Sequence, residues 1–261
     1  AVWQRALIMA AGAFMNFLLG FVVMVVLIAA QSEPITSRVI YAIDDGALCG
    51  QTGLEAGDQV LAVNGRRCFV ANDMLYELMR TEDYSARFTV LRGGEKVELP
   101  CVRFDTWQDD SGETHMSLGF TVYGIRKTPA NVVKEAWNSV LYYGRIIFTS
   151  LMDLLRGRES INDLSGPVGI VTAIGQAASY GWQDLLQLLV LITVNLGIFN
   201  LLPFPALDGG KVVFLLIEGV TGHAVPEKIQ SGLTLAAFAL LFGLMLFATY
   251  NDILRLITGA V

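Results

Sequence analysis

One short stretch of this sequence combines the residue types that chemistry inside a membrane requires. From Asn195 to Gly210 the chain reads NLGIFNLLPFPALDGG, in which two prolines, two adjacent glycines and a single carboxylate follow an apolar run. Proline removes a backbone donor and glycine permits tight turns, so the pattern predicts that a helix ends here and gives way to non-helical chain. Asp208 lies inside that break, where an ionisable side chain is a candidate functional residue.

The residues alone leave two interpretations of Asp208 open. A carboxylate is an ordinary zinc ligand, and a catalytic zinc takes three protein ligands and a water, so Asp208 could supply one ligand but not the whole set. Alternatively, Asp208 is a structural cap for a helix that starts at Gly209. The two histidines, His115 and His223, lie in polar surroundings and are typical of ordinary surface residues.

The composition predicts a membrane protein. The 261 residues are 54% hydrophobic and 16% charged, whereas soluble domains are about a quarter charged. A formal net charge of −6 without a basic run argues against nucleic-acid partners. Cys49, Cys68 and Cys101 have no CxxC spacing, which favours free or partly paired thiols over a zinc knuckle or a full disulfide set.

Three apolar runs are long enough to cross a bilayer core of roughly 30 Å as helices. They cover residues 6–30, 185–202 and 233–250. In the first run, Gly12 and Asn16 lie near one helical face with other small residues, and we expect this face to pack against another helix. The runs predict one transmembrane helix within residues 1–32 and two within 183–261, flanking the proline-containing break.

Residues 33–127 are expected to form a separate α/β insert. Short β-rich runs there alternate with turn residues, and Arg92-Gly93-Gly94-Glu95 is typical of a tight hairpin turn. The segment GLEAGDQVLAVNG, from Gly53 to Gly65, resembles the GLxxGDxIxxING segment of a PDZ domain. That resemblance implies capture of a peptide strand by edge addition, with Gly53, Leu54, Gly57 and Asp58 as candidate peptide-binding residues.

Residues 128–182 mix apolar and charged positions and are predicted to be an amphipathic interfacial segment. The expected fold class is therefore a multi-pass α-helical membrane protein with an inserted α/β PDZ domain.

The break itself carries a family resemblance. NLGIFNLLPFPALDGG is similar to the NxxPxPxLDGG motif of the RseP-type site-2 proteases, which are zinc intramembrane metalloproteases with a PDZ domain. LSGPVGI at 164–170, the helix at 3–16 and Asn251-Asp252 resemble further segments of that family, although Ala13 stands where the family usually has proline.

The resemblance implies that Asp208 is the third ligand of a catalytic Zn²⁺. It also implies that Asn200, Pro203, Pro205 and Gly209 hold an extended substrate beside the metal. In this scheme zinc lowers the pKa of its water to about 7, a glutamate removes the proton, and hydroxide attacks a carbonyl of an unwound transmembrane segment.

The same resemblance places two histidines and the catalytic glutamate in an HExxH motif, which this sequence does not contain. We therefore expect a fragment that lacks the preceding HExxH helix, has no catalytic residue of its own and is inactive alone. The family further implies regulated intramembrane proteolysis, location in the cell membrane with the PDZ-like domain outside the cytoplasm, and transmembrane substrates such as membrane-anchored regulators.

Two other functions remain open from the residues. A non-catalytic membrane scaffold with a peptide-binding PDZ domain would explain the missing histidine pair. An ion-coupled transporter would explain a carboxylate in a broken helix, but the PDZ-like insert and the lack of inverted halves count against it.

Overall fold

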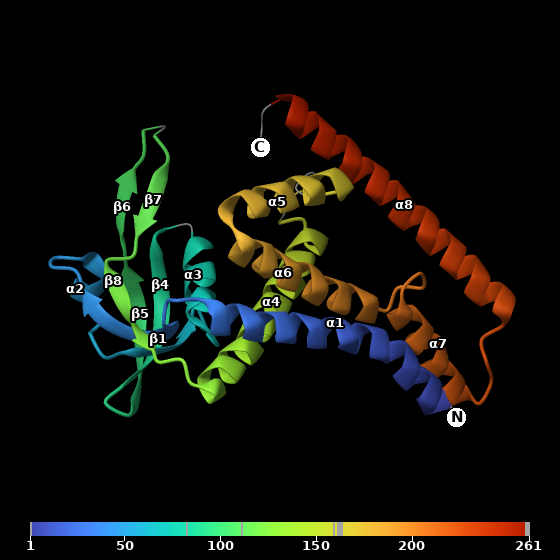
Figure 1. Ribbon diagram of the computed structural model, residues 1–261, viewed down its shortest axis with the longest axis horizontal. Coiled ribbons are helices and arrows are strands. Elements are labelled where there is room, and N and C mark those ends of the chain that lie inside the picture. The colour runs from blue at the N-terminus through green and yellow to red at the C-terminus, as the bar shows by residue number, and fades with distance from the viewer. Residues whose placement is uncertain (1, 82, 111, 159, 161–163, 259–261) are drawn as a thin grey trace. The chain divides into compact units, whose positions relative to one another are not determined.

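The structure is a computed structural model that describes residues 2–258 apart from 82, 111, 159 and 161–163 (Figure 1). The chain folds as two compact units. One contains the residues up to Leu27 together with those from Tyr143 onwards, and the other contains Ile28–Tyr142. The second unit is therefore an insertion in the sequence of the first, as the polar character of this stretch predicts.

The first unit is helical. Its elements are α1 (Val2–Ala30), the second half of α4 (Pro129–Leu155), α5 (Pro167–Tyr180), α6 (Trp182–Leu201), α7 (Asp208–Thr221) and α8 (Glu227–Thr258). Within the described part of the chain, α1, α6 and α8 are the helices long and apolar enough to cross a membrane. They confirm the three predicted spans, and each begins before the apolar run that predicted it. The chain is an integral membrane protein.

Small residues let α1 and α6 approach closely. A Cβ atom added at Gly20 would lie 3.1 Å from both Thr193 Oγ1 and Val194 Cγ2, and one at Gly197 would lie 3.0 Å from the Phe17 ring. Each glycine therefore makes room for a side chain of the other helix, which is how membrane helices pack without a hydrophobic driving force between them.

The segment predicted as one interfacial stretch contains two helices, α4 and α5. The α5 start is held by α8, because the Gly169 amide donates a hydrogen bond of 2.7 Å to Asp252 Oδ2. A Cβ at Gly166 or Gly169 would lie 2.9 Å from the Asp252 carboxylate. The two outlying motifs, SGPVG and Asn251-Asp252, thus form one contact, whereas the interfacial location of the segment stays a prediction.

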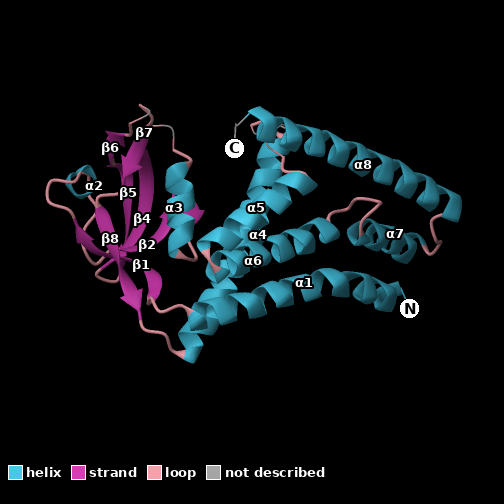
Figure 2. Cartoon of the chain, turned by 45° about the horizontal axis from the view of Figure 1, so that its top comes forward, coloured by secondary structure: helices cyan, strands magenta, loops and turns pink. Residues whose placement is uncertain are grey.

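The inserted unit is an antiparallel sheet with short helices (Figure 2). Its elements are β1 (Ile35–Ile43), α2 (Leu48–Gln51), β2 (Gln59–Val63), β3 (Arg66–Arg67), α3 (Ala71–Met79), β4 (Ser85–Arg92), β5 (Glu95–Arg103), β6 (Asp105–Gln108), β7 (Thr114–Ser117), β8 (Phe120–Ile125) and the first half of α4. The main sheet has the order β5-β4-β2-β1-β8, with β3 beside β2, and β6–β7 form a separate hairpin.

The interior of this sheet follows from strand alternation. Phe88 and Val90 are two residues apart on β4 and are fully buried. Val60 and Val63 of β2 are three apart, and both are buried in the same core because the β2–β4 register shifts between Val60 and Ala62. The α3 helix packs over β1 and β2 and contributes Met74 and Leu78 to the same core. These contacts, together with the membrane helices, confirm the predicted fold class of a multi-pass helical protein with an inserted PDZ-like domain.

Two local predictions are confirmed. The β4–β5 connection is a tight hairpin in which Arg92 pairs with Glu95, and Gly93 and Gly94 adopt φ values of +57° and +90°. A two-residue turn of this kind needs positive φ at both central positions, which glycine provides without strain. All three cysteines are free thiols; Cys49 and Cys68 are buried and Cys101 is exposed.

Candidate metal and substrate site

The helix break lies where the prolines predict it. The α6 helix ends at Leu201, and α7 begins at Asp208. Between them the Phe204 amide donates to the Leu202 carbonyl at 2.7 Å, and the Leu207 amide donates to the Phe204 carbonyl at 2.9 Å. The Pro205 carbonyl accepts a hydrogen bond of 3.2 Å from Thr234 Oγ1 of α8. The connection is therefore a turn in which several backbone groups are paired within the protein, as non-helical backbone between membrane helices requires.

The two glycines after Asp208 are required by backbone contact. Both are buried in the first turn of α7. A Cβ atom at Gly209 would overlap the carbonyl groups of Leu201 and Leu202, and one at Gly210 would overlap the carbonyl of Phe204. Because backbone cannot yield as a flexible side chain can, only glycine fits, and the start of α7 is pressed against the end of α6.

Asp208 is the first helical residue of α7 and is partly exposed, with 37% of its side chain accessible. Its Oδ1 atom lies 3.2 Å from the Lys211 ammonium one turn later. Its Oδ2 atom faces α1, where a Cβ added at Gly12 would be 3.6 Å away. The N-cap position is Leu207, and no side chain caps the helix there. The capping interpretation therefore fails in its simple form, although a carboxylate in the first turn still complements the helix dipole.

The other predicted substrate residues surround this break. Asn200 lies in the last turn of α6 and is half-buried, Pro203 is exposed, and Pro205 and Gly209 follow in the turn and in α7. Their contact with a substrate stays a prediction. On α1, Gly12 faces Asp208 and Asn16 is half-buried, whereas the close approach to α6 is made at Gly20. Lys211 is the neighbour that sequence reasoning missed; its i, i+3 spacing from Asp208 could have indicated it.

Among the described residues, no group of three potential metal ligands includes Asp208. The group of three potential ligands found among these residues lies in the inserted unit, on the β6–β7 hairpin. It consists of Asp109, Glu113 and His115, whose ligand atoms lie within 4.8 Å of one another. His115 Nε2 is 2.9 Å from Asp109 Oδ2. Its ring also lies against Trp107, with centroids 4.8 Å apart, so these contacts account for its position as a surface histidine.

The candidate PDZ residues form a closed turn. Leu54 is 1% exposed and Asp58 is fully buried. The Arg92 guanidinium donates 2.7 Å hydrogen bonds to both Asp58 oxygens and to the Gly53 carbonyl. This carboxylate raises the pKa of Arg92. Gly53 and Gly57 have positive φ. Direct peptide binding by these residues stays a prediction, and their visible role is to close the turn between α2 and β2.

Comparison with known proteins gives a consistent family signal. The family model for peptidase family M50 matches residues 1–244. The chain is 31% identical over 255 residues to "Regulator of sigma-W protease RasP" of Bacillus subtilis, covering 98% of this chain and 60% of that protein. It is 33% identical over 251 residues to "Zinc metalloprotease RasP" of Geobacillus kaustophilus, covering 96% and 59%. A third relative, "Putative zinc metalloprotease Atu1380" of Agrobacterium fabrum, is 29% identical over 266 residues.

Proposed function

Since this chain belongs to peptidase family M50, a family of intramembrane zinc metalloproteases, we propose that it is the part of a site-2 protease that supplies Asp208 to the zinc. The chain spans 60% of the length of the Bacillus subtilis relative and 59% of the Geobacillus relative. The activity, substrates and partners of a whole protease are therefore proposals for this chain.

One observation carries the assignment of Asp208. Its carboxylate lies directly after a helix break, at the start of a helix that glycines hold tightly against α6, and one oxygen faces α1. The backbone around it is fixed by hydrogen bonds and close packing, so the point from which the carboxylate extends is defined before any metal arrives. A ligand held in place in this way loses little conformational entropy on binding.

The residues at the break fit a zinc ion only in part. Asp208 offers one hard oxygen ligand, and among the described residues no further carboxylate, histidine or cysteine completes a group of three with it. A catalytic zinc would need two more protein ligands, and in the proposal these belong to an HExxH motif outside the 261 residues. When bound, zinc would supply a polarised water for peptide hydrolysis.

The break also supports a substrate role for its backbone. The turn from Leu202 to Leu207 leaves Pro203 exposed and places it within one turn of Asn200. Prolines cannot donate hydrogen bonds, and the Leu202 and Phe204 carbonyls each accept one within the turn, so the Asn200 side-chain amide is the group proposed to hold an extended substrate. In the proposal this segment aligns a locally unwound transmembrane substrate beside Asp208.

The inserted PDZ-like unit is proposed to restrict which substrates reach the break. Its β8 strand is paired on one side, with β1, and is the last strand of the sheet order, which leaves an edge suited to strand addition. One relative is named a regulator of sigma-W protease. By analogy we propose membrane-anchored regulators as substrates, with the PDZ-like unit outside the cytoplasm of a cell membrane.

Reconstituted cleavage tests this function. The protein as its natural gene encodes it would be placed in lipid vesicles with a single-span substrate that carries a label at each end. Asp208→Asn should lower cleavage at least a hundredfold, because a metal ligand is lost. Asp184→Asn, an exposed carboxylate in the first turn of α6, is the matched control and should cleave normally. Cleavage that survives Asp208→Asn, or labelled substrate that is bound but never cut, would favour the scaffold alternative.

A further inference from the structure

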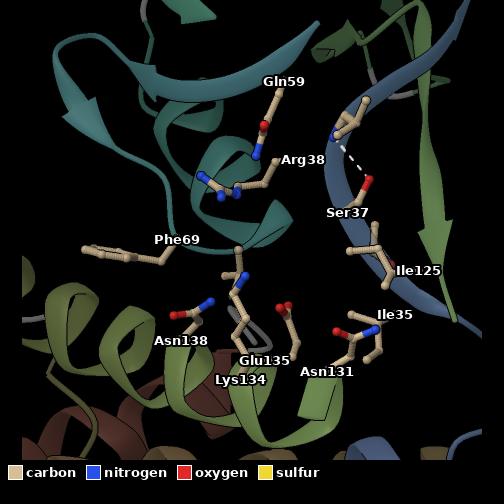
Figure 3. Close-up of a pocket in the computed structure, with 13 residues that line it drawn as sticks. Ile35, Ser37, Arg38, Gln59, Phe69, Ile125, Asn131, Lys134, Glu135 and Asn138 are labelled. Atoms are coloured by element: carbon tan, nitrogen blue, oxygen red, sulfur yellow. Dashed lines mark hydrogen bonds between the residues drawn. The ribbon is translucent and has the colours of Figure 1, made fainter. Parts of the chain in front are cut away.

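A polar cavity lies inside the inserted unit. It has a volume of about 130 Å³ and is walled by the first half of β1, the loop that leads into α3, and the first turns of α4. Figure 3 shows polar side chains of Arg38, Gln59, Lys134 and Glu135 directed into this space from opposite walls. Apolar side chains of Ile35, Phe69 and Ile125 form part of its rim.

One face of α4 supplies half of the polar lining. Asn131, Lys134, Glu135 and Asn138 have the spacing i, i+3, i+4 and i+7 and therefore lie on a single helical face. The neighbouring positions Val132, Ala136 and Val140 are buried. These buried apolar residues account for the packing of this part of α4, so the polar face is not needed to hold the helix in place.

Arg38 is held rigidly in the opposite wall. Its Nη1 atom donates to the Cys68 carbonyl and, at 3.3 Å, to the Val60 carbonyl. These two bonds fix the plane of the guanidinium, which has five N–H donors in all and keeps others available.

Four polar side chains of the described cavity lining make no hydrogen bond, whereas Asn131 donates to the Arg126 carbonyl at 2.9 Å and Ser37 accepts from the Val39 amide at 3.1 Å. Within the part of the chain that the structure describes, no hydrogen bond or ion pair involves the side chains of Gln59, Lys134, Glu135 or Asn138. Figure 3 places nitrogen atoms of Arg38, Gln59 and Lys134 around the same space. Several donors that converge on a cavity without satisfying one another are the arrangement expected of a site for an anionic group.

We propose that this cavity binds the carboxylate of an extended polypeptide segment, held between Arg38 and Lys134. A planar guanidinium matches a carboxylate geometrically, and the volume holds one carboxylate with a few waters, each of which takes about 30 Å³ in the liquid. The segment comes from the strand edge, because Ile125 is both the last residue of β8 and part of the cavity rim. The proposal deepens the role proposed for the PDZ-like unit and is independent of the zinc.

Glu135 makes the site sensitive to pH. Burial raises its pKa from 4.5 to about 7, against the opposing effects of Arg38 on β1 and Lys134 on α4, while Asp73 on α3 raises it further. Below pH 7 the neutral carboxyl group can donate a hydrogen bond to a bound carboxylate. Above pH 7 the ionised form repels it, so binding weakens as the pH rises.

The test uses three peptides that are identical except at the acidic group. Each is a ten-residue, Thr- and Val-rich chain: one carries a central Glu with both ends blocked, one has Gln in its place, and one has Gln with a free terminal carboxylate. Calorimetric titration of the purified chain in detergent micelles at pH 6 should show the Glu peptide binding about tenfold more tightly than the blocked Gln peptide. Preference for the free-terminus peptide would assign the site to chain ends instead of side chains.

Variants separate the cavity from the rest of the surface. Lys134 is exposed, so its replacement leaves the packing intact. Lys134→Gln should lower the ratio of the affinities for the Glu and blocked Gln peptides about tenfold. Lys96→Gln, on the opposite edge strand β5, is the matched control and should change nothing. Glu135→Gln should make the affinity at pH 8 equal to that at pH 6. Equal binding of the Glu and blocked Gln peptides, or a preference unaffected by Lys134→Gln, would overturn the proposal.

Discussion

Gly12 of α1 and Asp208 of α7 lie so close that a methyl group on the glycine would stand 3.6 Å from the carboxylate, in ordinary contact with it. The two residues are far apart in sequence, and their proximity makes α1 one wall of the candidate metal site. A metal bound by Asp208 Oδ2 would therefore share limited space with the α1 backbone.

A large side chain at position 12 should disturb that space. Gly12→Leu is expected to lower cleavage by the natural protein about a hundredfold, because displacement of a site by about 1 Å costs that much. Gly12→Ala is the control, since its methyl group fits at 3.6 Å. The measurement is the cleavage rate of each variant in vesicles. If Gly12→Leu cleaves as fast as Gly12→Ala, α1 does not border the site.

The glycine pair after Asp208 should be intolerant of any side chain. Gly209→Ala introduces a Cβ atom into the carbonyl groups at the end of α6, and overpacking of this kind costs about 1–3 kcal/mol of unfolding free energy. Gly243→Ala in α8 meets open space and should be neutral or stabilising by up to about 1 kcal/mol. Thermal unfolding of both variants in the same detergent would test this, and equal melting temperatures would contradict it.

The Asp58–Arg92 pair should hold the PDZ-like unit together. Asp58 is fully buried, and Asp58→Ala removes both carboxylate oxygens that Arg92 binds. We expect the free energy of unfolding to fall by about 3 kcal/mol, because the arginine charge is left without its partner. Glu55 pairs with the same arginine but is 62% exposed, so Glu55→Gln should cost less than about 1 kcal/mol. Chemical denaturation followed by circular dichroism separates the two; similar losses would show that burial of Asp58 is not what matters.

Stability should fall as the pH rises through the titration of Glu135. Its folded pKa of about 7 lies above the ordinary 4.5, so the folded state holds the proton more tightly and is favoured at low pH. Between pH 4.5 and pH 7 the loss should reach about 1–2 kcal/mol after allowance for solvent screening. Glu135→Gln should be more stable than the wild type at pH 8 and equal to it at pH 4. A pH profile that Glu135→Gln leaves unchanged would assign the effect to other groups.

Much of the fold could be predicted because the signals are local. The apolar runs predicted α1, α6 and α8, and the prolines and glycines predicted the break between α6 and α7. Hydrophobic alternation and turn residues predicted the strands around the Gly93-Gly94 turn. Each of these features depends on neighbours within a few residues, which is the range that sequence patterns report.

The contacts that define the sites could not be predicted in the same way. The approach of Gly12 to Asp208, the hold of Asp252 on the α5 start and the capture of Asp58 by Arg92 join residues far apart in sequence. The GLEAGD segment predicts a peptide-binding element, which stays a prediction, and the structure adds that its Asp58 is buried and hydrogen-bonded to Arg92. A single sequence carries no signal for such pairings.

Zinc content tests the central claim most directly. The protein as its natural gene encodes it would be purified without chelators, in wild-type, Asp208→Asn and Asp184→Asn forms, and its zinc measured by elemental analysis. The account predicts about one zinc per chain in the wild type and in Asp184→Asn, and its loss from Asp208→Asn. Zinc that stays bound in Asp208→Asn, or a wild type that binds none, would contradict the assignment of Asp208 as a metal ligand.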